Sequence, residues 1–442
     1  MFYLQFKGHQ NKMIKRLKNQ FFNETTHFER LFVIFGLCCS FFINLEASIT
    51  KAVSNSLFIH AYGYEFLPYA WLALVPLNFV IVNLYNKFIP RIGLFKMMLC
   101  TTAVTVLISL LAAFFIFNFK GFPFLLYIWK DLYILLMFQQ LWSMLAATLS
   151  TGQAKNFYGL FWGIGGLGAV TGSFFPGFLA TFIGSEKLFL VTLPFYVLLV
   201  ICFYLALKTR DKHLKKEPVQ FDQKKPSSFV EGAKLIKKSR ILLFIFLIVI
   251  FMQACSTLLD FQFNQTLAEY IQDKDLRTQY LGRFFGLVNG SNVILQFIGS
   301  YFVLNFLGVK KTHLSIPLYL GMLTLGTIFF PSFSILALTY GSIKALDYSI
   351  FGIVREILYI PLKVEEKFQG RAVIDVFVYR TSKALASLCI IGFGSLTTFN
   401  LSPIITKVLF FLFGLWSITV IFLLKSEANA IIQPQKEEVV EN

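Results

Sequence analysis

"KTRDKHLKKEPVQFDQKKPSSFVEGAKLIKKSR" occupies residues 208–240, near the middle of the chain. The stretch contains eleven Lys and Arg residues against four Asp and Glu residues, and it is the longest polar stretch between the apolar runs of the sequence. This composition predicts a solvated linker. Six long apolar runs precede it and six follow it, so the linker divides the chain into two halves.

The overall composition is typical of a membrane protein. Of the 442 residues, 56% are hydrophobic and 14% are charged, and the mean hydropathy is +0.67. A soluble domain carries about a quarter charged residues, so this chain cannot bury its apolar surface in a water-soluble core. The net charge is +17. In an apolar chain the basic residues are expected to set the membrane topology, and a nucleic-acid partner is not expected.

The apolar runs predict the number of spans, because a spanning helix needs about 20 mostly apolar residues. Twelve runs meet this requirement: 30–49, 66–86, 94–117, 122–148, 157–183, 188–207, 241–263, 280–305, 312–330, 333–353, 373–396 and 403–424. With the N-terminus inside, 29 Lys and Arg residues lie on the cytoplasmic side and six on the opposite side. Cytoplasmic loops carry such an excess, so both termini are predicted to be cytoplasmic.

These runs also predict the domain organisation. The expected regions are a basic cytoplasmic segment (1–29), a six-helix bundle (30–207), the linker (208–240), a second six-helix bundle (241–424) and a cytoplasmic tail (425–442). Two six-helix halves on one chain form the plan of major-facilitator-type transporters. The predicted fold class is therefore an all-α integral membrane protein with twelve transmembrane helices in two bundles.

Ionisable side chains within the predicted spans are functional candidates, because each is costly in hydrocarbon unless it faces a cavity or a partner. Lys344 and Asp347 are three residues apart on one helical face, so they can neutralise each other. Lys130 and Asp131 point roughly 100° apart, so each is expected to find a partner on another helix. The ten deepest residues are Glu46, Lys130, Asp131, Asp260, Arg283, Lys344, Asp347, Asp375, Arg380 and Lys383.

Arg380 and Lys383 give the sharpest indication of a ligand. They lie three residues apart on one helical face, and two like charges in a span need an anion or acids to balance them. Asp375, two turns earlier, cannot neutralise both. An anion site is the first hypothesis, since Arg is well shaped for phosphate. The alternative is a closed salt-bridge network with acids such as Asp260.

The sequence contains no catalytic or metal-binding pattern. Its six cysteines lie within apolar runs and show no CxxC or other metal spacing. No nucleophile stands beside a base in a soluble segment. We therefore expect no enzymatic activity, no cofactor, no metal and no disulfide.

"EILYIPLKVEEKFQGRAVIDVFVYRTSKA" (residues 356–384) resembles a stretch of the non-mitochondrial ATP/ADP translocase family of plastids and intracellular bacteria. The family pattern reads approximately M-A-Y-I-P-L-D-x-E-x-K-x-K-G-K-A-A-I-D and continues to R-x-G-K-S. Three other stretches are similar to family motifs: "SNSLFIHAYGYEFLPY" (54–69), "GQAKNFYGLF" (152–161) and "TLLDFQFN" (257–264). The resemblance implies a nucleotide transporter, in the bacterial inner membrane.

Several family charges are absent from this chain. The acidic residue before Ala-Lys is Gln153 here, and the Arg after it is Asn156. The Lys that opens the 54–69 motif is Ser54, and the Lys at the end of the 257–264 motif is Asn264, although the acid before it is kept as Asp260. Because these positions are the family's usual substrate-handling candidates, the resemblance supports the broad class more strongly than ATP/ADP exchange.

The sequence thus predicts secondary transport of a nucleotide, by ATP/ADP-type exchange, or of a related organic phosphate, by alternating access. The substrate-binding candidates are Arg380, Lys383, Lys130 and Arg283. The gating and coupling candidates are Asp260, Asp375, Glu46, Lys344, Asp347, Arg371 and Lys155. The expected partners are membrane lipids and a small anionic substrate.

Three alternatives stay open from the residues alone. A proton-coupled transporter of a different solute would use Asp260 or Glu46 as its proton carrier. A transport-inactive membrane scaffold of the same fold would tolerate loss of Arg380 and Lys383. A lipid-handling protein would open a polar groove laterally to the bilayer.

Overall fold

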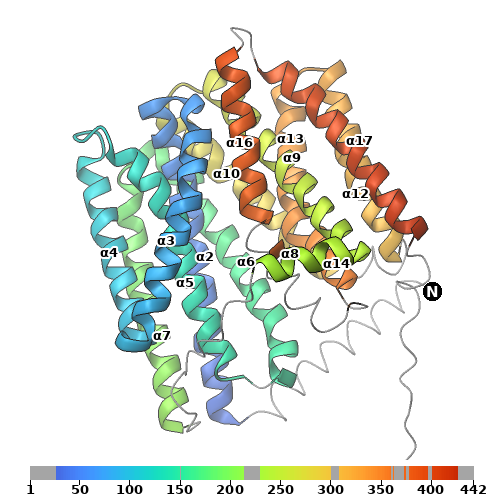
Figure 1. Cartoon of the computed structure of the whole chain (residues 1–442). Helices are drawn as coiled ribbons and strands as arrows, with labels where there is room; N and C mark the ends of the chain where they lie inside the picture. Colours follow the sequence, from blue (N-terminus) through green and yellow to red (C-terminus); the bar gives the residue numbers. More distant parts are fainter. Residues whose placement is uncertain are drawn as a thin grey trace, which may run out of the picture. The chain divides into compact units, whose positions relative to one another are not determined.

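The computed structural model describes residues 26–149, 151–213, 229–299, 308–359, 362, 373–374, 378–396 and 401–426 (Figure 1). These residues form helices, and no strand occurs among them. The all-helical prediction is confirmed for this part of the chain.

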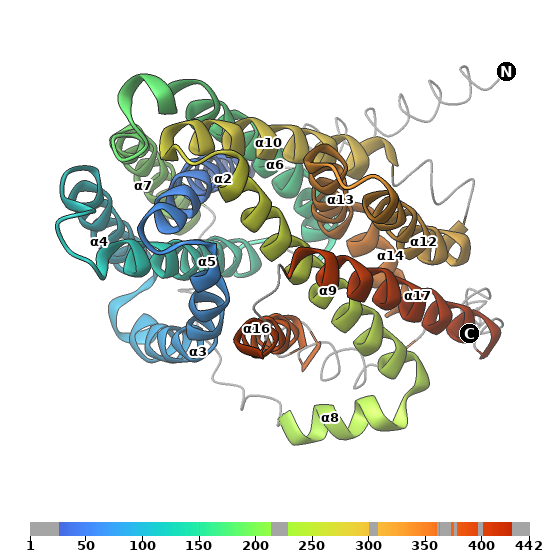
Figure 2. The same cartoon turned by 90° about the horizontal axis from the view of Figure 1, so that it is seen from above.

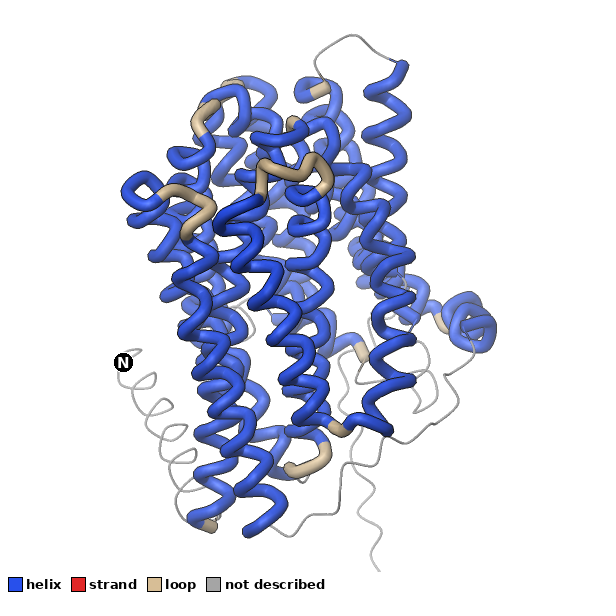
Figure 3. The backbone as a smooth tube through the Cα atoms, turned by 90° about the vertical axis from the view of Figure 1, so that its left-hand side faces the viewer, coloured by secondary structure: helices blue, strands red, loops and turns tan. Residues whose placement is uncertain are grey.

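Each of the six apolar runs before the linker overlaps a helix, and the helix on the first run extends furthest past it, to Tyr62 instead of residue 49. Short loops connect several of the helices (Figure 3). Gly63 and Gly93 lie between helical elements with φ of 90° and 83°, a conformation that glycine adopts without a steric penalty. The elements are α2 (His27–Tyr62), η1 (Tyr64–Phe66), α3 (Leu67–Ile92), α4 (Leu94–Phe115), α5 (Phe122–Ala146), α6 (Thr151–Ile183) and α7 (Leu188–His213).

The helices after the linker are less regular. Two of them continue into π-helical turns, η2 and η3, and such turns are frequent at functional sites. The elements are α8 (Phe229–Lys238), α9 (Arg240–Tyr270), α10 (Lys274–Ile294), η2 (Leu295–Gly299), α12 (Gly308–Phe329), α13 (Phe333–Leu346), η3 (Asp347–Phe351), α14 (Gly352–Leu358), α16 (Tyr379–Leu396) and α17 (Ser402–Ser426).

Nine helical segments in the described part of the chain are long and apolar enough to cross a membrane, by length and composition. They correspond to nine of the twelve predicted runs. The other three runs, 280–305, 333–353 and 373–396, overlap α10, the interrupted α13–η3–α14 segment and α16. Basic residues lie in all three runs, and charged side chains lower the hydropathy. The number of twelve spans and the orientation of the termini stay predictions.

Backbone-to-backbone packing joins α6 to α2. A Cβ on Gly168 would lie 2.3 Å from the Phe41 carbonyl oxygen, and one on Gly172 would lie 2.0 Å from the Leu45 carbonyl oxygen. No other residue fits these two positions without a shift of the helices. Small residues that allow close approach are a usual feature of helix pairs in membranes, and here they fix α2 in place.

The described residues group into two compact units. The first lies within Met1–Leu57, Asn78–Asp222 and Thr278–Gly286, and the second within Phe58–Leu77, Gln223–Arg277 and Leu287–Asn442. The predicted bundle boundaries are not the boundaries of these units, because the start of α3 groups with the second unit and part of α10 with the first. The domain boundaries therefore remain a prediction.

Helix α9 is central to the second unit. It packs against α13, α16 and α17, and α17 packs in turn against α12 (Figure 2). Its buried face includes Phe263, whose ring stacks on Tyr340 of α13 with 4.5 Å between centroids. This packing sets the register between α9 and α13, and therefore which polar residues of the two helices meet.

Candidate substrate and gating site

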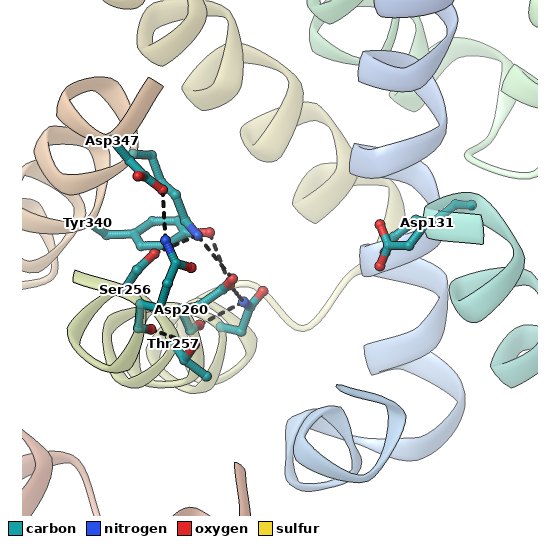
Figure 4. Close-up of polar contacts among 10 residues, drawn as sticks. Asp131, Ser256, Thr257, Asp260, Tyr340 and Asp347 are labelled. Carbon is teal, nitrogen blue, oxygen red and sulfur yellow. Dashed lines mark hydrogen bonds and ion pairs between the residues drawn. The ribbon is translucent and has the colours of Figure 1, made fainter. Parts of the chain in front are cut away.

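Asp260 of α9 lies at the centre of a polar cluster with α13 (Figure 4). Its carboxylate forms an ion pair with Lys344, at 3.5 Å between Oδ2 and Nζ. It also accepts hydrogen bonds from the Tyr340 hydroxyl and from Asn264 Nδ2, each at 2.9 Å. Tyr340 and Lys344 lie four residues apart in α13, so both reach α9 from one helical face.

The cluster extends along both helices. Lys344 Nζ donates to the Ser256 hydroxyl at 2.9 Å, and Gln253 Nε2 donates to Asp347 Oδ2 at 3.3 Å. Asp347 is the first residue of the π-helical turn η3. We call the following residues the Asp260–Lys344 network: Gln253, Ser256, Asp260, Asn264, Tyr340, Lys344 and Asp347.

The network is partly exposed. The side chains of Lys344 and Asp260 are 17% and 19% exposed. An anion that contacts Lys344 would compete with Asp260 for it. The two hydrogen bonds from Tyr340 and Asn264 would still stabilise the Asp260 carboxylate.

The structure changes the sequence interpretation of these acids. The sequence pairs Lys344 with Asp347 and gives Asp260 no basic residue within one turn. In the structure, Lys344 forms its ion pair with Asp260. Asn264, noted in the sequence only as the replacement of a family Lys, donates to the same acid. The sequence did not single out Tyr340, and no spacing within one helix could have identified it.

Lys130 and Asp131 correct a second expectation. Lys130 Nζ lies 3.1 Å from Asp131 Oδ2 and 3.7 Å from the centroid of the Tyr127 ring. The expectation that each would pair with another helix was wrong, because the long Lys side chain bends back to its neighbour. The Lys130 side chain is 5% exposed and that of Asp131 is 41% exposed.

Glu46 of α2 is a buried acid of a different kind. Its Oε1 accepts hydrogen bonds from the hydroxyls of Thr50, Tyr133 and Tyr196, each at 2.5 Å. The two tyrosines come from α5 and α7. Its Oε2 is buried without a hydrogen-bond partner among the described residues, and none of their basic side chains forms an ion pair with it. Three helices thus converge on one carboxyl group.

Arg283 of α10 contacts α6. Its Nε donates to the Gly177 carbonyl at 2.9 Å, and its guanidinium lies 5.7 Å from the Phe178 ring centroid. The two backbones are close at this point, since a Cβ on Gly282 would lie 2.3 Å from the Gly177 nitrogen. Arg283 therefore helps to join α6 and α10, and its role as a substrate ligand stays a prediction.

The Arg380 and Lys383 pair is described in part. Lys383 of α16 is half-buried, and its Nζ lies 4.8 Å from the centroid of the buried Trp71 ring. The side chains of Arg380 and Lys155, and Asp375 and Arg371 as whole residues, lie outside the described residues. Among the His, Cys, Asp and Glu residues that are described, no group could hold a metal ion.

Comparisons with known proteins add to this geometry. The family model described as Major Facilitator Superfamily matches residues 91–362, more than half of the chain. The chain belongs to this superfamily. A second model, described as TLC ATP/ADP transporter, matches residues 334–427 and confirms the resemblance to the ATP/ADP translocase family. This second match includes Tyr340, Lys344 and Asp347 of the Asp260–Lys344 network.

The relatives found among known proteins are carrier proteins of intracellular bacteria, and their sequence identity to this chain is low. The ADP,ATP carrier protein 1 of Rickettsia bellii is 23% identical over 337 residues, which are 68% of this chain and 67% of the relative. The protein of the same name from Chlamydia muridarum is 24% identical over 350 residues, which cover 68% of this chain and 63% of the Chlamydia protein.

Solved structures of the superfamily share the fold. The nucleoside transporter NupG superposes with a TM-score of 0.60 at 13% identity, covering 91% of this chain and 100% of that one. A bacterial homologue of the iron transporter ferroportin, in its inward-facing state, gives a TM-score of 0.63 at 13% identity, covering 90% and 99%. With the family matches, these findings make the chain an integral, multi-pass membrane transporter and not an enzyme.

Proposed function

We propose that this transporter carries nucleotides or related organic phosphates across a bacterial inner membrane by alternating access between two six-helix bundles. The observation that carries the proposal is the part-exposed Lys344, which forms an ion pair with Asp260. The match to the ATP/ADP transporter model over residues 334–427 supports it, and so do the names of the relatives.

The proposed mechanism is an exchange of counter-charges. A phosphate group would replace Asp260 at Lys344, and Asp260 would take the ammonium group back when the substrate leaves. Arg380 and Lys383 would supply further positive charge, with Lys130 and Arg283 as additional candidates. Arg371 and Lys155 would form an inner gate. Each contact would be strengthened by exclusion of water from the site.

The missing family charges widen the substrate class. Ser54 and Asn264 stand at two positions where the family has a Lys, so neither can supply a cation to a triphosphate chain. Ser54 is 1% exposed, and Asn264 donates a hydrogen bond to Asp260. A site with fewer cations would balance fewer phosphate charges. Organic phosphates with lower charge than ATP therefore belong in the proposed class.

A thermal-stability screen of the purified full chain tests the proposal. We expect ADP, ATP or another phosphorylated compound to raise the Tm, and the matching dephosphorylated compounds to have no effect. At a ligand concentration of 100 times the Kd, the expected stabilisation is about 2.7 kcal/mol. Stabilisation by amino acids or neutral sugars only would exclude the phosphate class, and a response to no solute would favour a transport-inactive scaffold.

Glu46 supports a second candidate function, proton-coupled transport. A carboxylate buried without a cation is costly, and uptake of a proton removes that charge. Described groups that contact Glu46 from α5 and α7 are the hydroxyls of Tyr133 and Tyr196, and neither is a cation. A carboxyl that can take up and release a proton inside the bundle is what proton coupling requires.

Glu46→Gln tests this second candidate. Gln has the shape of a protonated Glu, so we expect the variant to fold with nearly unchanged Tm and to transport at a rate independent of pH between pH 5 and 8. Tyr133→Phe is the control, since it removes one hydroxyl and keeps the acid. Identical pH profiles for the wild type and Glu46→Gln would limit Glu46 to a structural role.

A further inference from the structure

Helix α8 has an orientation unlike that of its neighbours in the second unit. It comes just before α9, which begins at Arg240, and it packs against α9. Figure 2 shows α16 along its axis and α8 lengthwise, so α8 lies across the direction of that span. Figure 1 shows α8 beside one end of α9. With α16 in the predicted span 373–396, a helix that lies across it runs parallel to the membrane surface.

The two faces of α8 differ in chemistry. Lys234, Lys237 and Lys238 follow the spacing i, i+3, i+4, which places them on one face of the helix, and all three are exposed. Ile236 points to the opposite side and is only 5% exposed. Arg240 is exposed at the start of α9. We call Lys234, Lys237, Lys238 and Arg240 the α8 basic face.

The positive charge of the α8 basic face is not balanced within the described structure. None of its four residues forms an ion pair with a described acid. Basic residues that only set the membrane topology can lie anywhere in the loop. They do not need to share one face of a helix whose opposite face carries a buried residue such as Ile236. The arrangement therefore indicates a partner with several negative charges.

We propose that the α8 basic face binds the anionic headgroups of the surrounding lipid leaflet. The chain spans the membrane, and α8 ends within two residues of the start of a spanning helix. At 1.5 Å per residue, all four basic residues lie within about 10 Å of that start. This is the level of the headgroups. Cytoplasmic leaflets carry anionic lipids, which attract clusters of basic residues beside spans.

A lipid headgroup fits this face better than a soluble anion. All four side chains are exposed, and exposed side chains do not enclose a single phosphate ion. Headgroups are present at high local concentration along the whole length of α8, and several can be contacted at once. The proposal rests on the membrane location of the chain and is independent of the transported substrate.

The test uses the purified full chain in a zwitterionic detergent, titrated with dioctanoyl-phosphatidylglycerol and, separately, with dioctanoyl-phosphatidylcholine. Native mass spectrometry counts the lipid molecules that stay bound. We expect phosphatidylglycerol to bind in preference to phosphatidylcholine. Replacing Lys234, Lys237 and Lys238 by Gln should weaken phosphatidylglycerol binding about 100-fold, at about fivefold for each cation.

A matched triple replacement elsewhere is the control. Lys120, Lys187 and Lys407 are also exposed basic residues near the ends of helices. They are not neighbours in the sequence and are predicted on the opposite side of the membrane, so their replacement by Gln should change the affinity by less than about threefold. Replacing the three α8 lysines by Arg keeps the positive charge and should preserve phosphatidylglycerol binding. This result would show that the helix tolerates substitution at these positions. An equal loss in both Gln triples would overturn the proposal. Competition by inorganic phosphate at the lipid's own concentration would assign the face to a soluble anion instead.

Discussion

Lys344→Gln is expected to lower the affinity for a phosphorylated ligand by about 100-fold. Loss of one partner from a buried, hydrogen-bonded charge contact costs about 2–5 kcal/mol. Lys344 is the basic residue of the Asp260–Lys344 network, with its Nζ held by Asp260 and Ser256. The Kd from ligand-dependent Tm shifts and the initial rate of labelled-nucleotide uptake in proteoliposomes measure the effect.

Stability should change less than binding. Without Lys344, the Asp260 carboxylate keeps its hydrogen bonds from Tyr340 and Asn264, and it is 19% exposed. We therefore expect the free energy of unfolding to fall by about 1–2 kcal/mol, which is less than the roughly 2.7 kcal/mol of a 100-fold loss of affinity. Tyr340→Phe is the control, because it removes a hydrogen bond to Asp260 and leaves both charges in place.

Asp260→Asn should act in the opposite direction on binding. The variant frees Lys344 from its counter-charge, so a phosphate no longer competes with a carboxylate. The expected result is roughly tenfold tighter binding with slower turnover, because the substrate is not displaced on release. If Lys344→Gln bound and transported phosphorylated ligands as the wild type does, the exchange of counter-charges would be excluded.

The sequence predicts the helices well and the pairs between them poorly. Apolar runs of about 20 residues mark helices whatever their neighbours are, and nine of the twelve runs meet the length and composition of a span in the described residues. The pairing of Asp260 with Lys344 depends instead on the register between α9 and α13. Packing such as that of Phe263 on Tyr340 sets this register, and no spacing along one helix contains it.

Glu46 and Lys130 illustrate the same limit in different ways. The sequence marks Glu46 as a buried acid, but its hydroxyl donors come from α5 and α7. Two tyrosines in apolar runs carry no signal that they would meet one carboxyl. For Lys130, helical geometry gives the direction of Cβ and not of Nζ, and the side chain is long enough to reach Asp131.

The sequence predicts the role of the α6 glycines but not their partner helix. The run "GIGGLGAVTG" (residues 163–172) is not preceded by a strand, and it therefore predicts close helix packing and no nucleotide loop. Gly168 and Gly172 meet the backbone of α2 as that reasoning requires. The identity of the partner helix came only from the structure, because a small residue permits close approach without selecting what approaches.

Arg380→Gln combined with Lys383→Gln is expected to abolish binding of phosphorylated ligands while membrane insertion and folding are retained. The predicted span of residues 373–396 begins just after Arg371. At 1.5 Å per residue, Arg380 lies about 13 Å along its axis from Arg371, and Lys383 lies one turn deeper. That depth approaches the middle of a hydrocarbon core about 30 Å thick, where a charge needs a cavity or a partner.

The described contact of Lys383 defines the controls. Its ammonium lies over the Trp71 ring, and a cation–π contact contributes about 0.5–2 kcal/mol. Trp71→Phe keeps an aromatic face and should change the Tm more than the Kd for a phosphorylated ligand. Lys407→Gln removes an exposed basic residue of α17 and should leave the Kd unchanged.

Arg380→Lys separates charge from shape. Lys keeps the positive charge but cannot form two parallel hydrogen bonds to a phosphate. With one charge-assisted hydrogen bond lost at about 1.5–3 kcal/mol, the Kd should rise by at least about tenfold. An unchanged Kd in this variant, together with normal binding and uptake in the Gln double variant, would show that both charges are structural. The phosphate substrate would then have to bind through Lys344, so a loss of binding in Lys344→Gln alone would restrict the anion site to the interface of α9 and α13.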